Sequence, residues 1–127
     1  MKALLDTHTF IWWLKDDPSL SSLARQTVTN PDVEIFVSAA TIWEIATKIR
    51  IGKLDPAPFQ NGIEAEILAE SFSAIPVTPA HAEKAGYLDH KHKDPFDRML
   101  IAQALVEGLV IISNETLFDQ FGVPRLW

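Results

Sequence analysis

The sequence contains no cysteine, which excludes disulfide bonds, thiolate catalysis and zinc sites built from cysteine. It also lacks any uncharged apolar run close to the roughly 18 residues of a transmembrane helix, because charged residues from Asp6 onward interrupt the apolar start of the chain. Basic residues are few, with 11 Lys and Arg against 17 Asp and Glu and a net charge of −6. We therefore expect a soluble, cytoplasmic protein with no membrane contact.

The acidic balance by itself argues against a nucleic-acid ligand, because Lys and Arg contacts to phosphate supply much of the affinity of nucleic-acid-binding proteins. This objection weakens where several acidic residues together hold divalent cations, because the ions reverse the local field. The positions of the acidic residues along the chain therefore matter more than their number.

The length of 127 residues and the hydrophobic content of 47% are those of one compact domain, expected to span residues 1–127. Short β-rich segments alternate with helical patterns, which predicts an α/β sandwich with a mostly parallel sheet. Pro76 favours an edge position for the third strand. Strands are expected at residues 2–5, 34–37, 74–77 and 109–112, with a final extended segment at 123–127.

Helical patterns fill the segments between these strands. The pattern over residues 39–51 places apolar residues at helical spacing, and Gly52 supplies a stop. Asp94 before Pro95 predicts the start of another helix. Helices are expected at residues 7–14, 20–28 after a cap at Ser19, 39–51, 59–71, 79–88, 95–107 and 116–121, and a polar loop at residues 90–93.

Five acidic residues fall where an α/β sheet places its functional groups, beyond the carboxyl ends of strands and at the helix starts that face them. Asp6 ends the first strand, Glu44 lies in the helix after the second, and Glu115 follows the fourth. Asp94 and Asp97 occupy the first turn of a helix. Mg²⁺ prefers such oxygen ligands, and bound ions can activate water and stabilise the leaving oxygen in phosphodiester hydrolysis.

Structural roles compete with this functional interpretation. Considered alone, Asp94 before proline is more often a helix N-cap than a ligand. Asp97 at the third helical position favours the positive helix end, and Glu115 can serve as a first-turn acid. Glu44 can pair with Lys48 at i, i+4 or with Thr41 in a Thr-x-x-Glu pattern. Only the acid that ends the first strand has no evident local capping partner, so function is favoured there.

Aromatic and histidine residues give weaker indications. Trp12, Trp13 and Trp43 can stack on nucleic-acid bases, although burial in a core or a dimer interface is the commoner fate of such large apolar side chains. His8 follows Asp6 closely and is expected to neighbour a metal site rather than to ligate the ion. His92 is expected in the solvated loop.

Three segments together resemble the PIN-domain proteins, above all the VapC-type toxins of bacterial type II toxin–antitoxin pairs. These segments are LLDTH at residues 4–8, SAATIWEI at 38–45 with GKL at 52–54, and HKDPFDRMLIAQA at 92–104. The resemblance covers essentially the whole chain. It implies a PIN-like three-layer sandwich, with helices on both faces of a mostly parallel central sheet.

The resemblance also implies an activity. Proteins of this kind are Mg²⁺- or Mn²⁺-dependent endoribonucleases, usually homodimers, held inactive by a cognate antitoxin. It assigns the catalytic acids to Asp6, Glu44 and Asp97, and the metal site to these three with Asp94 and Glu115. The family usually has Asp where this chain has Glu115, and the longer side chain reaches differently, so this position departs from the family pattern for direct or water-mediated metal binding.

Two other functions remain open. A phospho-receiver domain also gathers acids at parallel strand ends, but it would need paired acids after the first strand and a lysine after the last. Here Thr7 and His8 follow Asp6. A catalytically inactive α/β module that survives through partner contacts is the second alternative, which the substitution at Glu115 leaves open.

Overall fold

Five parallel strands form a single sheet at the centre of this computed structural model, which describes residues 1–89 and 92–127. The loop predicted at His90 and Lys91 lies outside the described residues. The strand order is β3-β2-β1-β4-β5, and every neighbouring pair is parallel. The strands are β1 (Lys2–Leu5), β2 (Glu34–Ser38), β3 (Ser73–Ile75), β4 (Val110–Ile112) and β5 (Arg125–Leu126).

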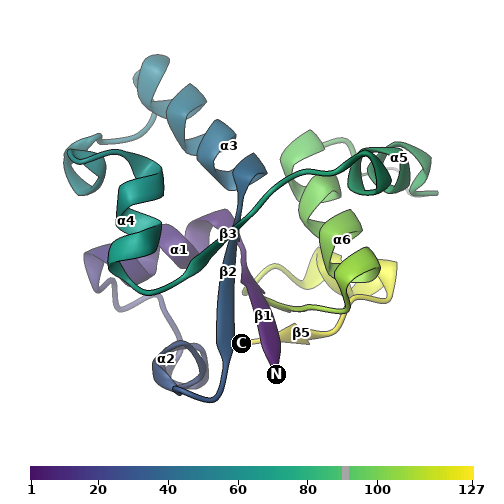
Figure 1. The fold of residues 1–127 in the computed structure, drawn as a ribbon, viewed down its shortest axis with the longest axis horizontal. Coiled ribbons are helices and arrows are strands. Elements are labelled where there is room, and N and C mark those ends of the chain that lie inside the picture. The colour runs from purple at the N-terminus through teal and green to yellow at the C-terminus, as the bar shows by residue number, and fades with distance from the viewer. Residues whose placement is uncertain (90–91) are drawn as a thin grey trace.

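Helices cover both faces of the sheet, which confirms the predicted three-layer arrangement. In Figure 1, α1, α2 and α4 lie on one side of β1 and β2, and α5 and α6 lie on the other. No helix in the described part of the chain is long and apolar enough to cross a membrane. The helices are α1 (Thr7–Lys15), α2 (Ser22–Thr29), α3 (Ala39–Arg50), α4 (Ile63–Ala69), α5 (Pro79–Tyr87) and α6 (Pro95–Glu107), with short 3-10 segments η1 (Ala57–Phe59) and η2 (Thr116–Phe121).

The predicted cap of the second helix was wrong by two residues. The Ser21 hydroxyl, not that of Ser19, accepts the backbone N–H of Ala24 at 3.0 Å and caps α2. Ser19 instead donates its backbone N–H to the Asp17 carboxylate at 2.8 Å, in the turn between α1 and α2. Two serines two residues apart carry the same capping chemistry, so local sequence could not separate them.

The helix predicted over residues 59–71 is shorter than expected. Gly62 has φ 97°, a conformation that strongly favours glycine, and it separates η1 from α4. The following strand β3 lies at the sheet edge, as Pro76 predicted.

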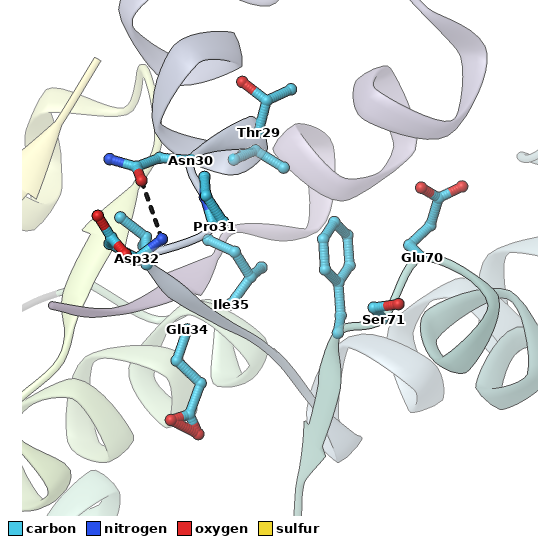
Figure 2. A pocket seen from close by; sticks show the side chains of 11 residues that line it. Thr29, Asn30, Pro31, Asp32, Glu34, Ile35, Glu70 and Ser71 are labelled. Carbon is cyan, nitrogen blue, oxygen red and sulfur yellow. Dashed lines mark hydrogen bonds between the residues drawn. The ribbon is translucent and has the colours of Figure 1, made fainter.

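The turn from α2 into β2 is closed by a hydrogen bond from the backbone N–H of Asp32 to the Asn30 side-chain oxygen at 2.9 Å (Figure 2). A cavity of about 400 Å³ lies between this turn and residues 70–72, which precede β3. The turn after α2 leads into β2, and residues 70–72 lead into β3. The cavity therefore lies at the amino ends of β2 and β3, at the end of the sheet opposite to Asp6.

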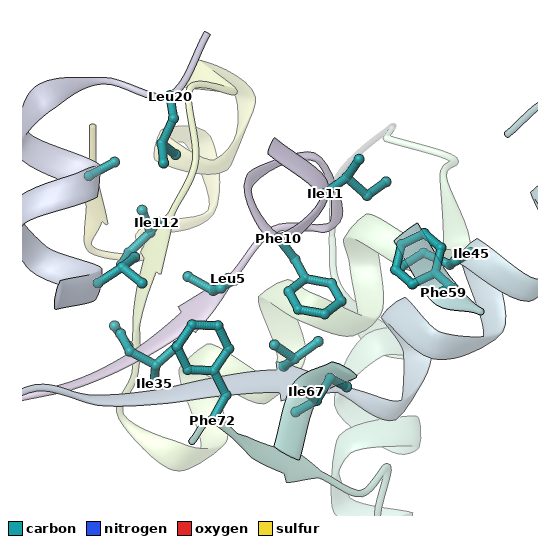
Figure 3. Close-up of a cluster of buried hydrophobic side chains, with 14 residues drawn as sticks. Leu5, Phe10, Ile11, Leu20, Ile35, Ile45, Phe59, Ile67, Phe72 and Ile112 are labelled. Atoms are coloured by element: carbon teal, nitrogen blue, oxygen red, sulfur yellow. The ribbon is translucent and has the colours of Figure 1, made fainter. Parts of the chain in front are cut away.

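The two faces of the sheet bury separate hydrophobic clusters. Along β1 the side chains alternate, so Ala3 and Leu5 join one cluster and Leu4 joins the other. Figure 3 shows the first cluster, where Phe10 of α1 and Ile45 of α3 pack beside the sheet. Because β1 is buried on both faces, its position is fixed by packing. The position of Asp6, the residue that follows it, is therefore fixed as well.

Candidate active site

The strand order reverses beside β1. The chain runs from β1 through β2 to β3 on one side, and then returns to place β4 and β5 on the other. In open α/β sheets, ligands bind beyond the carboxyl ends of the strands at such a switch point. Asp6 follows β1 and Ser113 follows β4, and the Ser113 hydroxyl donates to Asp6 Oδ2 at 2.7 Å. The two strand ends are thus joined through buried polar side chains.

Asp6 also has a local partner, contrary to the expectation from the sequence. Its Oδ1 accepts the backbone N–H of Thr7 at 2.8 Å, so Asp6 is the N-cap of α1. Burial raises the pKa of Asp6 above its usual value, and the negative charge of Glu44 acts in the same direction. Hydrogen bonds from Ser113 and Thr7 and the electrostatic effect of His8 oppose that rise.

Glu44 lies in α3 with both carboxylate oxygens bonded. The Thr7 hydroxyl donates to Oε1 at 2.7 Å, and Lys48 Nζ donates to Oε2 at 2.6 Å. The Thr41 hydroxyl lies 3.0 Å from that of Thr7 and extends the network. Glu44 is buried with only 5% exposure, so its pairing with Lys48 is more than a solvated surface contact.

Asp97 lies in the first turn of α6, where its Oδ2 contacts His92 Nε2 at 2.9 Å. Burial raises the pKa of Asp97 to about 6, with further increases from the charges of Asp6 and Asp94 and an opposing effect of the His92 hydrogen bond. Arg98 donates to the backbone carbonyl of His92 at 3.0 Å. The loop residue His92 is therefore fixed against α6.

Asp94 and Glu115 both cap helical segments. The Asp94 carboxylate accepts the backbone N–H groups of Phe96 at 2.9 Å and Asp97 at 3.3 Å, which makes it the N-cap of α6. Glu115 Oε1 accepts the backbone N–H of Leu117 at 3.0 Å and caps η2. The capping role considered for Asp94 is therefore present, whereas Glu115 precedes η2 as its N-cap and is not an acid of its first turn.

All five predicted acids nevertheless border one cavity of about 310 Å³ at the carboxyl ends of β1 and β4. Four of them are linked by their charges, since Asp6 and Asp94 raise the pKa of Asp97 and Glu44 raises the pKa of Asp6. The residues that line this cavity, called here the acidic pocket, are Asp6, His8, Trp12, Glu44, Lys48, Asp94, Asp97, Asn114 and Glu115.

Within the ranges 1–89 and 92–127, no three acidic or histidine side chains are placed together to hold a metal ion as they stand. Several carboxylate oxygens instead carry protein donors, namely Ser113 on Asp6, Lys48 on Glu44 and His92 on Asp97. Five of the nine residues that line the pocket carry carboxylate oxygens, which are the donors that hard divalent cations select. The residues therefore fit such an ion by type.

Sequence reasoning missed the hydroxyl groups of Thr7 and Ser113, while Thr41, expected as a partner of Glu44, reaches that carboxylate through Thr7. Thr7, Thr41 and Ser113 are all buried, and they contact Asp6 or Glu44 directly or through each other. One signal was available, because Ser113 directly follows β4 just as Asp6 directly follows β1. The contact of His92 with Asp97 was missed because a polar loop gave no reason to place it.

Comparison with known proteins gives a consistent result. The family model for the PIN domain matches residues 3–124. None of the curated proteins matches the chain in sequence.

Solved structures share the fold over nearly the whole chain. VapBC2 from Rickettsia felis, bound to a DNA fragment from its promoter, gives a TM-score of 0.75 at 13% identity and covers 99% of this chain and 98% of its own. DNA-bound VapBC from Salmonella typhimurium gives 0.67 at 19% identity, covering 99% and 97%. VapBC-5 from Mycobacterium tuberculosis, of the VapBC family of toxin-antitoxin systems, gives 0.61 at 16% identity and covers 98% of each chain.

Proposed function

This chain belongs to the PIN domain family, a family of nucleases, and from that premise we propose that it is an endoribonuclease that hydrolyses RNA phosphodiester bonds. The observation that carries the proposal is the position of Asp6, Glu44 and Asp97 on one acidic pocket at the strand switch point. Clustered carboxylates suit a divalent cation that activates water against a phosphodiester, for which Mg²⁺ is proposed, with Mn²⁺ able to replace it.

Asp6, Glu44 and Asp97 would hold the ion, with Asp94 and Glu115 on the rim as outer ligands. When bound, the ion would supply Lewis acidity toward a water molecule and the phosphate. Ser113 and Thr7 hold Asp6 and Glu44 in place, and Lys48 compensates the charge of Glu44. These contacts keep mutually repelling carboxylates at one site before a ligand arrives.

A cognate antitoxin is the proposed regulatory partner. Several structural relatives are VapBC complexes, and a pocket bordered by five acids suits an inserted Arg or Lys side chain. Such a segment would occlude the cation and the phosphate site together. A purified partner that binds the chain yet leaves Mn²⁺ affinity and RNA cleavage unchanged would contradict this inhibitory role.

A homodimer is the proposed assembly, supported by an apolar surface beside the acidic pocket. Trp43 is 65% exposed and meets Phe96 edge to face with ring centroids 5.0 Å apart. Clustered exposed apolar groups usually mark an interaction surface. The cavity beside this pair, called here the α3–α6 patch, is lined by Ala39, Ala40, Trp43, Val77, Pro95, Phe96 and Met99.

The nuclease proposal is tested with Asp6→Asn and Asp97→Asn in the full chain. Each change removes a negative charge from the pocket, and we expect cleavage of single-stranded RNA with Mg²⁺ to fall at least about 100-fold. Glu64→Gln, at an exposed acid on α4, is the matched control and should cleave as wild type does. Undiminished cleavage by either Asp→Asn variant would refute the assignment.

The inactive-module alternative keeps one supporting observation, the glutamate at position 115 that caps η2. It predicts a chain that binds a partner but neither Mg²⁺ nor Mn²⁺ in calorimetric titration. A phospho-receiver loses its support, because the PIN domain model accounts for residues 3–124.

A further inference from the structure

One wall of the acidic pocket is aromatic. His8 and Trp12 both line it, and they lie four residues apart on α1, so they share one face of that helix. His8 is exposed and Trp12 is half-buried. The nuclease proposal uses neither side chain, although both border the same cavity as the five acids.

Two other rings neighbour the Trp12 ring, and both are tilted against it, His8 by 47° and Trp127 by 56°. The Trp12 ring centroid lies 5.9 Å from that of His8 and 5.9 Å from that of Trp127. Trp12 and Trp127 also pack at the border of the larger hydrophobic cluster. An aromatic side chain fixed in this way loses little conformational freedom when a ligand stacks on it, which favours a preformed binding surface over a mobile one.

The two other aromatic candidates from the sequence are engaged elsewhere. Trp13, the next residue on α1, donates its indole N–H to Glu70 Oε2 at 3.1 Å and packs beside Phe72 at 6.1 Å between centroids. Trp43 borders the separate α3–α6 patch. Of the three tryptophans named from the sequence, only Trp12 lines the acidic pocket together with the carboxylates.

A pocket lined both by carboxylates and by a packed aromatic ring matches a nucleotide. The carboxylates, through a cation, suit the phosphate, and the ring suits a base. A volume of about 310 Å³ is at the small end for ligand sites, which suits one extruded nucleotide and not a duplex. Proteins read unpaired RNA bases by stacking them on aromatic side chains.

We propose that Trp12, flanked by His8, is the stacking platform for one unpaired RNA base next to the phosphate at the acidic pocket. This inference rests on the proposed ribonuclease function and specifies its substrate as single-stranded RNA. Stacking is tolerant of base identity, so the platform selects unpaired over paired RNA and contributes little preference among the four bases.

The test measures RNA binding in an Asp97→Asn background, in which cleavage is suppressed. The probes are a fluorescent ten-residue oligouridylate and an abasic oligonucleotide of the same length, each with Mg²⁺. We expect Trp12→Leu, which keeps apolar bulk, to weaken oligouridylate binding roughly 5- to 150-fold and to leave abasic binding unchanged. Trp12→Phe should recover most of the loss, and Trp13→Leu is the matched control with wild-type binding.

A second readout uses the cleaving chain without the Asp97 change. There Trp12→Leu should raise KM for oligouridylate more than it lowers kcat, because the ring binds a base and touches no reacting atom. Equal binding by Trp12→Leu and wild type would overturn the platform, as would an equal loss on the abasic probe. A Trp12→Leu variant that loses affinity only for the antitoxin would also overturn the platform. It would show that the aromatic wall of the acidic pocket binds the protein partner.

These outcomes separate the platform from the nuclease. A wild-type chain that binds oligouridylate through Trp12 but never cleaves RNA would refute the proposed function and leave the platform standing. A chain that cleaves RNA with no dependence on Trp12 would refute the platform alone. A wild-type chain that neither binds nor cleaves would refute both.

Discussion

Individual acids in the pocket carry structural and functional roles together. Asp6 caps α1 through the backbone N–H of Thr7, and Glu115 caps η2, yet both carboxylates border the acidic pocket. A cap requires one carboxylate oxygen and leaves further lone pairs for other partners. The structural and functional interpretations of a single acid therefore do not exclude each other, and the capping bond fixes the carboxylate that a cation would meet.

Asp97 should make the stability of the metal-free protein depend on pH. Its pKa of about 6 in the folded chain exceeds the ordinary value of 3.8, so between these pH values the folded chain binds more protons than the unfolded chain. Stability from this group is therefore present at low pH and is lost as pH rises through about 6. We expect a loss of about 1 kcal/mol, since water screens part of the effect at this partly open carboxylate.

The measurement compares urea unfolding of wild type and Asp97→Asn at several pH values from 4.5 to 7.5 with EDTA present. Because other carboxylates also titrate in this range, the difference between the two proteins is the relevant quantity. Wild type should lose stability relative to Asp97→Asn as pH rises. Parallel stability curves would show that the carboxyl has no raised pKa in the folded chain.

At the scale of elements, the strands and long helices could be predicted from the sequence pattern, whereas some helix boundaries could not. The β1 pattern at residues 2–5 and the α6 start at Pro95 were both predicted correctly, because an apolar run and an Asp-Pro pair act locally. The Ser19 cap failed because Ser19 lies in the turn after α1, where its backbone N–H bonds the Asp17 carboxylate, and Ser21 caps α2 instead. The predicted 59–71 helix is interrupted at Gly62, which adopts φ 97° and precedes α4 as its N-cap.

The N-terminus of α6 allows the two roles of Asp94 to be separated by substitution. Asp94→Ala removes the acceptor for the Phe96 and Asp97 backbone N–H groups and should lower the free energy of unfolding by about 1 kcal/mol. Asp94→Ser restores a capping oxygen without the charge, so it should recover most of that stability.

Metal binding then shows whether the negative charge of Asp94 matters. If Asp94 is also an outer metal ligand, Asp94→Ser should regain stability in urea unfolding but keep a weakened Mn²⁺ affinity in calorimetric titration. Wild-type Mn²⁺ affinity in Asp94→Ser would limit the residue to its capping role. Asp32→Ser, at an exposed acid near the far end of the sheet, is the control for a general charge effect.

At the scale of the whole molecule, the meeting of distant acids follows from topology. Parallel strands bring the positions after β1 and β4 to one edge, so the proximity of Asp6 to residues near 115 could be inferred from the strand pattern alone. The hydroxyl network could not, because the contact of Thr7 with Glu44 depends on how α1 and α3 pack. That packing is decided by the shared core and leaves no local trace in the sequence.

The proposed dimer gives the last prediction. Trp43 and Phe96 form the centre of the α3–α6 patch, and buried aromatic anchors at the centre of an interface commonly contribute 2 kcal/mol or more. Trp43→Glu would place a charge there, so we expect the dimer dissociation constant to rise by at least about 30-fold. Sedimentation velocity over a concentration series measures the change.

Leu68→Glu is the matched control for this surface. Leu68 is also a large exposed apolar residue, at 60%, but it lies on α4 and outside the α3–α6 patch. Its replacement should leave the dimer intact, because only a change at the interface adds an unpaired charge to a desolvated surface. A wild-type chain that stays monomeric at every concentration, or a Leu68→Glu variant that dissociates as readily as Trp43→Glu, would remove the α3–α6 patch as the dimer contact.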